Sequence, residues 1–185
     1  TAPAVYCLML DYAVAESEMA EYWYIRPGYE KAVQKHFENQ QEPEVSLESL
    51  IREKDFNEAG KGSAEVKNVL KRLGIDPAIL RRIAVASYEA EINVAAHSLG
   101  GAMLSHIYQD RIHMIFMDNG PGIADIEQAM MPGFSTADEM VRELGFGAGL
   151  GLPNIQKNVD ALHIVSEAGD STMLEFLIFF NDNGQ

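Results

Sequence analysis

A chain of 185 residues with a hydrophobic fraction of 47% can bury one core with an appended element, which excludes two large domains. Its formal net charge of -14 argues against nucleic acid or an anionic membrane as the main partner, since both require a basic surface. The apolar stretch at residues 4–10 is too short to span a bilayer and follows no basic flank, so the sequence predicts a cytoplasmic protein.

The first 44 residues differ in pattern from the rest of the chain. Two stretches with helical apolar periodicity, residues 11–25 and 29–39, are separated by the helix breaker Pro27-Gly28. They predict a helical extension over residues 1–44, in the form of a hairpin. Two roles are open for it: a surface for a partner or a homodimer, or a cover for the core. One face of the second helix gathers Tyr29, Ala32, Val33, His36 and Phe37.

Residues 45–185 have the pattern of one compact domain. In chain order, the apolar periods and breakers predict a strand at 45–54, helices at 64–73 and 77–98, strands at 102–108 and 111–117, a short helix at 124–131, a helix at 153–159, and strands at 163–167 and 172–180. Consecutive strand pairs with separate long helices predict an α/β two-layer sandwich. Its sheet would be mixed, mostly antiparallel, with helices on one face.

The long helix at 77–98 carries the first candidate motif. Glu89 and Asn93 lie one helical turn apart, where a carboxylate and an amide can position a nucleophile and bind a hard cation. An ordinary polar helix edge explains the same pair. The apolar periodicity assigns the core face of this helix to Val85, Tyr88, Ile92, Ala95 and Leu99.

The second motif, Asp118-Asn119-Gly120-Pro121-Gly122-Ile123, directly follows an apolar strand. Its two glycines allow the backbone to approach a flat ligand closely, and Asp118 can accept a hydrogen bond from an exocyclic amine such as that of adenine. A simple turn would use the same residue types. This motif alone therefore does not decide between a turn and a binding site.

The third motif places glycines at every second position, Gly147, Gly149 and Gly151, and runs into the helix at Pro153. Successive backbone N–H groups and a helix N-terminus suit phosphate. No βαβ unit surrounds the motif, which argues against a Rossmann fold. A P-loop is excluded at Lys61, because glycine follows it where that motif requires serine or threonine. A flexible hinge remains the alternative.

Taken in order, Glu89-x-x-x-Asn93, Asp118-x-Gly120-x-Gly122 and Gly147-x-Gly149-x-Gly151 resemble the N box and the two glycine boxes of the GHKL superfamily. This superfamily contains gyrase, heat-shock chaperones, histidine kinases and MutL. The resemblance extends over about residues 46–180. Residues 118–136 and 149–153 look most like the anti-sigma factor kinases and the switch kinase of the stressosome.

The resemblance implies ATP and Mg²⁺ as ligands and gives each motif a role. Asn93 would hold Mg²⁺, and Glu89 would orient or deprotonate the attacking hydroxyl. Asp118 would bind the adenine amine, with Gly120 beside it and Gly122 under the ring, and Thr172 would support the adenine through a hydroxyl or a water.

The remaining implied roles belong to the phosphates. They would be wrapped by Gly147, Gly149, Leu150 and Gly151. The segment 124–146 would form a lid over ATP. Its arginine, Arg142, would either reach the γ-phosphate as a catalytic group or form an exposed salt bridge.

Three functions fit this resemblance. The leading hypothesis is a protein serine/threonine kinase that phosphorylates an antagonist partner of the STAS type. The second is a histidine kinase catalytic domain with His36 as acceptor, although His36 lacks the adjoining acidic residue common on such helices. The third is an ATP-gated binding module that sequesters a sigma factor or another regulator without phosphotransfer.

Overall fold

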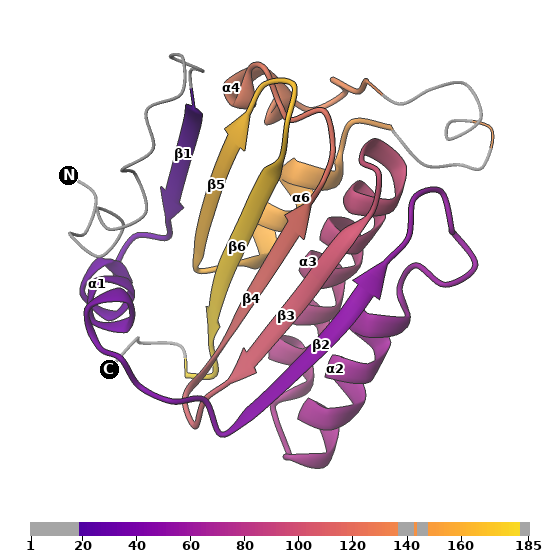
Figure 1. Cartoon of the computed structure of the whole chain (residues 1–185). Helices are drawn as coiled ribbons and strands as arrows, with labels where there is room; N and C mark the ends of the chain where they lie inside the picture. Colours follow the sequence, from indigo (N-terminus) through magenta and orange to yellow (C-terminus); the bar gives the residue numbers. More distant parts are fainter. Residues whose placement is uncertain (1–18, 137–142, 144–147, 182–185) are drawn as a thin grey trace.

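The computed structural model describes residues 19–136, 143 and 148–181 (Figure 1). Within these residues, one open sheet has the strand order β1-β5-β6-β4-β3-β2, and every neighbouring pair is antiparallel. The strands are β1 (Met19–Ile25), β2 (Val45–Ile51), β3 (Gly101–Ile107), β4 (Arg111–Asp118), β5 (Ala161–Glu167) and β6 (Thr172–Phe179).

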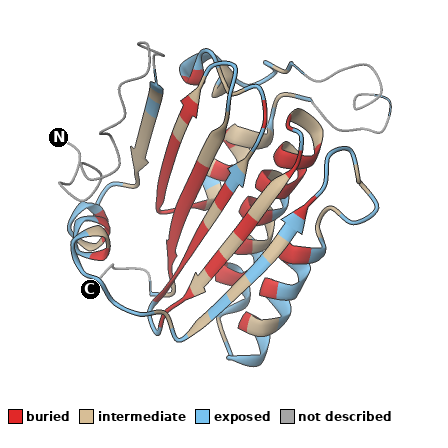
Figure 2. Cartoon of the chain, in the orientation of Figure 1, coloured by how far each residue is buried: buried red, intermediate tan, exposed pale blue. Residues whose placement is uncertain are grey.

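Three helices cover one face of this sheet: α2 (Lys61–Arg72), α3 (Pro77–His97) and α6 (Gly151–Asn158) (Figure 1). Alternate strand residues point toward them, because side chains alternate between the two faces of a strand. In β4 these are Ile112, Met114 and Phe116, which are all buried in the main core (Figure 2). The predicted two-layer α/β sandwich is therefore confirmed. A short helix, α4 (Ile126–Ala129), lies in the predicted lid segment.

The long helix α3 begins and ends at clear chain signals. The Asp76 side chain accepts a hydrogen bond from the backbone N–H of Ala78 at 2.8 Å, and Pro77 occupies the first turn, where its missing N–H costs nothing. The helix ends at His97, after which Ser98 is extended and Gly100 adopts a positive φ of 97°. No helix in the described part of the chain has the length and apolarity needed to cross a membrane.

The N-terminal part differs from the predicted helical hairpin. Residues 19–25 form the edge strand β1, not a helix, whereas residues 11–18 lie outside the described part. The physical reason is the aromatic run Tyr22-Trp23-Tyr24, which favours a strand that pairs with β5. Tyr22 and Tyr24 face the main core, and Trp23 stacks on His163 on the other face, with ring centroids 3.8 Å apart. The division of the chain at residue 44 stays a prediction.

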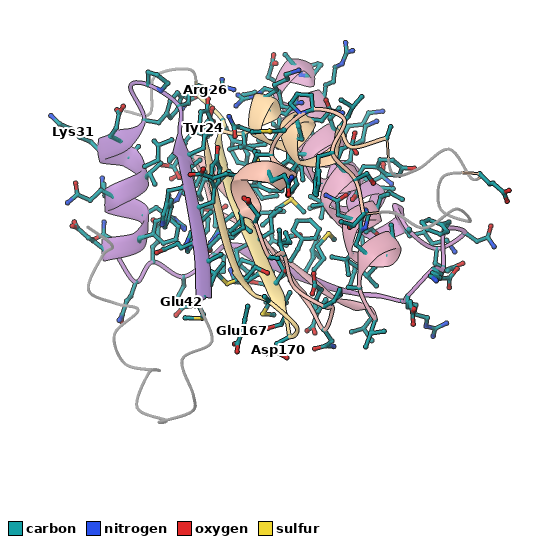
Figure 3. The ribbon with its side chains drawn as sticks, turned by 90° about the horizontal axis from the view of Figure 1, so that it is seen from above. Tyr24, Arg26, Lys31, Glu42, Glu167 and Asp170 are labelled. Carbon is teal, nitrogen blue, oxygen red and sulfur yellow. The ribbon has the colours of Figure 1, made fainter. Side chains whose placement is uncertain are left out.

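The second predicted helix is present as α1 (Glu30–Glu38). It packs on the sheet face opposite α2 and α3 (Figure 3). Its residue Val33, with the preceding Tyr29, is buried against Ala161, Leu177 and Phe179. This helix therefore covers part of the sheet, which was one of the two roles considered for the extension.

A chain of buried polar side chains lies between α1 and the sheet. Arg111 Nε donates to His36 Nδ1 at 2.8 Å, and His36 Nε2 lies 3.1 Å from His113 Nδ1. Glu175 accepts at one oxygen from His113 Nε2 at 2.7 Å and at the other from His163 Nδ1 at 2.8 Å. Because an arginine can only donate, His36 Nδ1 must accept, so its proton is on Nε2. The hydrogen bonds thus run in one direction from Arg111 to Glu175.

The titration of these groups is shifted by their surroundings. Burial lowers the pKa of His36 to about 3, assisted by the positive charge of Arg111, so its ring is neutral. Burial would by itself raise the pKa of Glu175, but the hydrogen bonds from His113 and His163 outweigh it and lower the pKa to about 2.

Candidate functional site

Asp118 is the last residue of β4 and is held by backbone groups on both sides. Its Oδ1 accepts from the N–H of Gly120 at 2.8 Å and from the N–H of Thr172 at 3.1 Å. Burial raises the pKa of Asp118, and these two hydrogen bonds offset part of the rise. Both hydrogen bonds from the described residues fall on Oδ1, so Oδ2 is the oxygen that can accept from a ligand.

The two glycines of the second motif lie where a side chain does not fit. A methyl group at Gly120 would lie 2.7 Å from Cβ of Ser98, just past the end of α3. At Gly122, which has a positive φ of 69°, it would lie 1.9 Å from the carbonyl oxygen of Glu167. The backbone of this loop therefore lies directly against the end of α3 and against the hairpin of β5 and β6.

Two hydroxyl groups secure the loop to this hairpin. Ser166 Oγ accepts from the N–H of Ile123 at 2.7 Å and lies 2.8 Å from Thr172 Oγ1. Thr172, predicted to support adenine, therefore contacts Asp118 through its backbone and Ser166 through its side chain. The predicted adenine residues Asp118, Gly120, Gly122 and Thr172 are thus brought together.

Glu89 and Asn93 lie half-buried on α3, and both contact the first turn of α6. Asn154 Nδ2 donates to Glu89 Oε1 at 2.9 Å. A methyl group at Gly151 would lie 2.8 Å from Asn93 Oδ1. The first motif and the C-terminal part of the third motif are therefore in direct contact, although Asn93 and Gly151 lie 58 positions apart in the sequence.

The prediction of which face of α3 enters the core is partly wrong. Tyr88 and Leu99 are exposed by 42% and 70%, whereas Ala86 and Ala90 are fully buried. The reason is that α3 is packed on three sides, by the sheet, by α2 and by α6 (Figure 1). Small alanine side chains allow these close approaches.

The glycine-rich motif is only partly described. Gly149 has a positive φ of 71°, and a methyl group on it would lie 2.5 Å from the backbone of both Gly133 and Phe134. Its carbonyl accepts from the N–H of Gly133 at 2.9 Å. Leu150 precedes α6 and is 47% exposed. Gly147, Arg142 and residues 137–142 and 144–146 of the predicted lid lie outside the described residues.

The oxygen ligands available between α3 and α6 fit a Mg²⁺ ion that binds together with a nucleotide. Among the described residues, no cluster of three or more His, Cys, Asp or Glu side chains could hold a metal ion alone. Mg²⁺ commonly keeps several waters and takes one or two protein oxygens plus substrate phosphates. Asn93 Oδ1, beside Gly151 at the start of α6, supplies such an oxygen next to helix N–H groups that suit phosphate.

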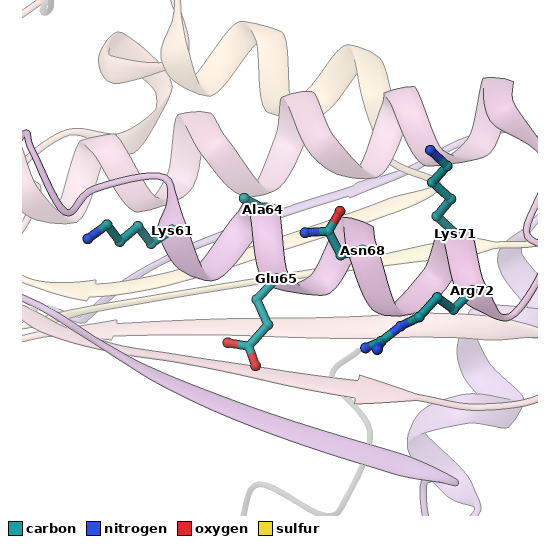
Figure 4. Close-up of a pocket in the computed structure, with 6 residues that line it drawn as sticks. All are labelled: Lys61, Ala64, Glu65, Asn68, Lys71 and Arg72. Atoms are coloured by element: carbon teal, nitrogen blue, oxygen red, sulfur yellow. The ribbon is translucent and has the colours of Figure 1, made fainter.

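A hollow of about 770 Å³ lies elsewhere on the surface, along the exposed side of α2 (Figure 4). Its lining contains none of the predicted site residues and consists of Lys61, Ala64, Glu65, Asn68, Lys71 and Arg72. These residues come from a single helix, and α3 separates that helix from α6 (Figure 1). The hollow is open to solvent, and its position on α2 does not indicate that it belongs to the site formed by the three motifs.

Three residues of the site were not among those predicted from the sequence. Asn154 contacts Glu89, Ser166 supports the Gly122 loop, and Ser98 packs against Gly120. Asn154 follows the glycine-rich motif directly, where a polar residue in a first helical turn is common. Its partner on α3 becomes evident only in the folded chain.

The fold and the assembled motifs define a class of protein, the GHKL-type ATP-binding domain. No protein-family model matches the chain. Over 113 residues, the chain is 32% identical to the serine/threonine-protein kinase RsbT of Bacillus subtilis, covering 59% of this chain and 79% of that protein. Over 116 residues, it is 29% identical to the anti-sigma F factor of Caldanaerobacter subterraneus, covering 59% and 78%. The chain belongs to the GHKL superfamily, in the family of anti-sigma factor and switch-protein serine/threonine kinases.

Proposed function

We propose that this chain is a Mg·ATP-dependent protein serine/threonine kinase of the partner-switching type, which phosphorylates an antagonist protein of the STAS type. The observation that carries the proposal is the contact of Glu89 and Asn93 with the first turn of α6. This contact brings a carboxylate and an amide oxygen to the helix start where phosphate would bind. The similarity to a serine/threonine-protein kinase supports the same function.

The protein groups act mainly by positioning, because phosphoryl transfer requires little covalent chemistry from the enzyme. Asp118 Oδ2 accepts from the adenine amine, and Asn93 Oδ1 would hold Mg²⁺. When bound, Mg²⁺ neutralises phosphate charge. Glu89 accepts the proton of the partner's hydroxyl group while the hydroxyl oxygen forms a bond to the γ-phosphorus. The bond between that phosphorus and the oxygen that bridges it to the β-phosphate breaks at the same time, which releases ADP.

A phosphotransfer assay tests this proposal. The purified protein is incubated with γ-labelled ATP, Mg²⁺ and a lysate of its own source, beside Glu89→Ala and the control Glu65→Ala on the exposed side of α2. We expect an acid-stable label on a partner protein with the native chain and with the control, and none with Glu89→Ala. Full labelling by Glu89→Ala would remove Glu89 from its proposed role.

A second function is favoured by the similarity to an anti-sigma F factor. In it, the ATP-loaded domain sequesters a regulator, and the nucleotide acts by selecting one conformation. A partner complex that forms with ATP, dissociates with ADP and contains no phosphoprotein would support this alternative over the kinase.

The geometry argues against His36 as a phosphate acceptor. His36 lies on the buried side of α1 and is 9% exposed, and both of its ring nitrogens are hydrogen-bonded, to Arg111 and to His113. A phosphoacceptor nitrogen must reach the γ-phosphate, which this position does not allow. An acid-labile label on the chain itself would revive the histidine kinase interpretation.

A further inference from the structure

The side chain of Asn154 reaches from α6 across to α3. Asn154 Nδ2 donates to Glu89 Oε1 at 2.9 Å, and both residues are partly buried. We propose that Asn154 is a positioning residue for Glu89, which holds the carboxylate in the orientation that accepts the hydroxyl proton. This inference rests on the proposed kinase function, since it concerns how the base of that reaction is aligned.

Asn154 is itself fixed by the helix that carries it. Its backbone N–H donates to the carbonyl of Leu150 at 2.9 Å, and its carbonyl accepts from Asn158 Nδ2 at 2.8 Å. The amide therefore starts from a fixed backbone, and one hydrogen bond fixes Oε1 of Glu89. The other carboxylate oxygen, Oε2, is then the one that faces the acceptor hydroxyl.

The chemical nature of the donor matters for this role. A cation beside Glu89 would favour its charged form and weaken it as a base. A neutral amide has no net charge, so it orients the carboxylate with a smaller loss of basicity. Lys157, the cationic residue in the last turn of α6, lies nearly one turn beyond Asn154.

The same helical turn also connects Glu89 to the nucleotide. Gly151, three residues before Asn154, lies against Asn93, so one turn of α6 contacts both site residues of α3. This turn directly continues the glycine-rich motif. The phosphate-binding end of α6 and the alignment of Glu89 therefore depend on the same helical turn.

Steady-state kinetics on Asn154→Ala tests the proposal. Gln156→Ala is the matched control, because Gln156 is an amide on the same helix whose Oε1 accepts from the Tyr22 hydroxyl of β1 at 2.7 Å. We expect Asn154→Ala to lower kcat by on the order of tenfold to a hundredfold, as for a misplaced catalytic group. The dissociation constant of Mg·ATP should stay within about twofold, because the adenine and phosphate contacts remain. Gln156→Ala should keep the kcat of the native chain, and thermal unfolding of all variants reports any loss of fold.

A second variant, Asn154→Asp, gives a readout that a merely structural role would not move. It keeps the shape but places a carboxylate against Glu89, and two adjacent carboxylates hold a proton more tightly. The acidic limb of the pH–rate profile should therefore move to higher pH. An unshifted limb would contradict the contact as the source of the effect.

The outcomes separate this proposal from the function on which it rests. A native chain that transfers no phosphate would overturn the kinase function and this proposal with it. An active native chain together with unchanged or increased kcat in Asn154→Ala would overturn only the positioning role. Equal losses in Asn154→Ala and Gln156→Ala would also overturn it, because they would trace the effect to α6 as a whole.

Discussion

The neutral, buried ring of His36 makes the stability of the chain depend on pH. Its pKa is lowered to about 3 in the folded chain, against 6.5 for an exposed histidine. The unfolded chain therefore binds a proton below pH 6.5 that the folded chain does not accept until about pH 3. The contribution of His36 is complete above pH 6.5 and decreases as the pH falls toward 3.

The size of the effect follows from the window between the two values. Each pH unit inside the window removes about 1.4 kcal/mol from the free energy of unfolding. Between pH 6.5 and pH 5 the loss is therefore about 2 kcal/mol. Glu175 does not contribute there, because its pKa falls from 4.5 to about 2 on folding. Its contribution is present above pH 4.5 and is lost only as the pH falls toward 2.

Urea unfolding of the native chain and of His36→Gln, at several values between pH 8 and pH 5, measures this effect. Glutamine can still accept from Arg111 and donate to His113, but it does not titrate. The other four histidines are present in both proteins and largely cancel in the difference. We expect the stability advantage of the native chain over the variant to shrink by about 2 kcal/mol from pH 8 to pH 5. A difference that stays constant with pH would refute the assignment of a neutral, buried His36.

Two further substitutions give separate tests. Gly151→Ala places a methyl group 2.8 Å from Asn93 Oδ1, so it should weaken the Mg²⁺ dependence of ATP binding, which magnesium titrations measure. The midpoint of thermal unfolding should change little. Asp160→Ala removes a fully buried carboxylate that pairs with Arg82 and Arg26, and it should lower the free energy of unfolding by about 3–5 kcal/mol, as measured in urea. A loss below about 1 kcal/mol would show that these two ion pairs do not stabilise the fold.

Much of the sandwich could be predicted because its signals are local. Pro77 and the Gly100-Gly101 pair delimit the long helix, and the turn at Gln109-Asp110 separates two apolar strands. The two glycine motifs were found in the same way, since backbone close approach requires glycine at fixed places. The structure confirms that need at Gly120 and Gly122.

The remaining features depend on contacts between distant residues. Residues 19–25 form the edge strand β1 because they pair with β5. The apolar periodicity of residues 11–25 gives no information about this distant partner. The series of side-chain hydrogen bonds from Arg111 to Glu175 connects α1 to two strands, and no spacing of residues in the sequence predicts it. The contact between Asn154 and Glu89 depends in the same way on how α6 packs against α3.

Isothermal titration of Mg·ATP into the native chain and Asp118→Asn tests the central claim most directly, which is that the three motifs form one ATP pocket. Asparagine can keep the hydrogen bonds to Oδ1, but its amide replaces the free carboxylate oxygen with a donor. A matched control is Asp76→Asn, at the opposite end of α3, where asparagine caps a helix as well as aspartate.

We expect the native chain and the control to bind ATP equally. Asp118→Asn should bind more weakly by roughly 1.5–3 kcal/mol, the worth of a hydrogen bond to a charged group, or about tenfold to 150-fold in affinity. Unchanged affinity in Asp118→Asn, or no binding by the native chain, would contradict the ATP pocket.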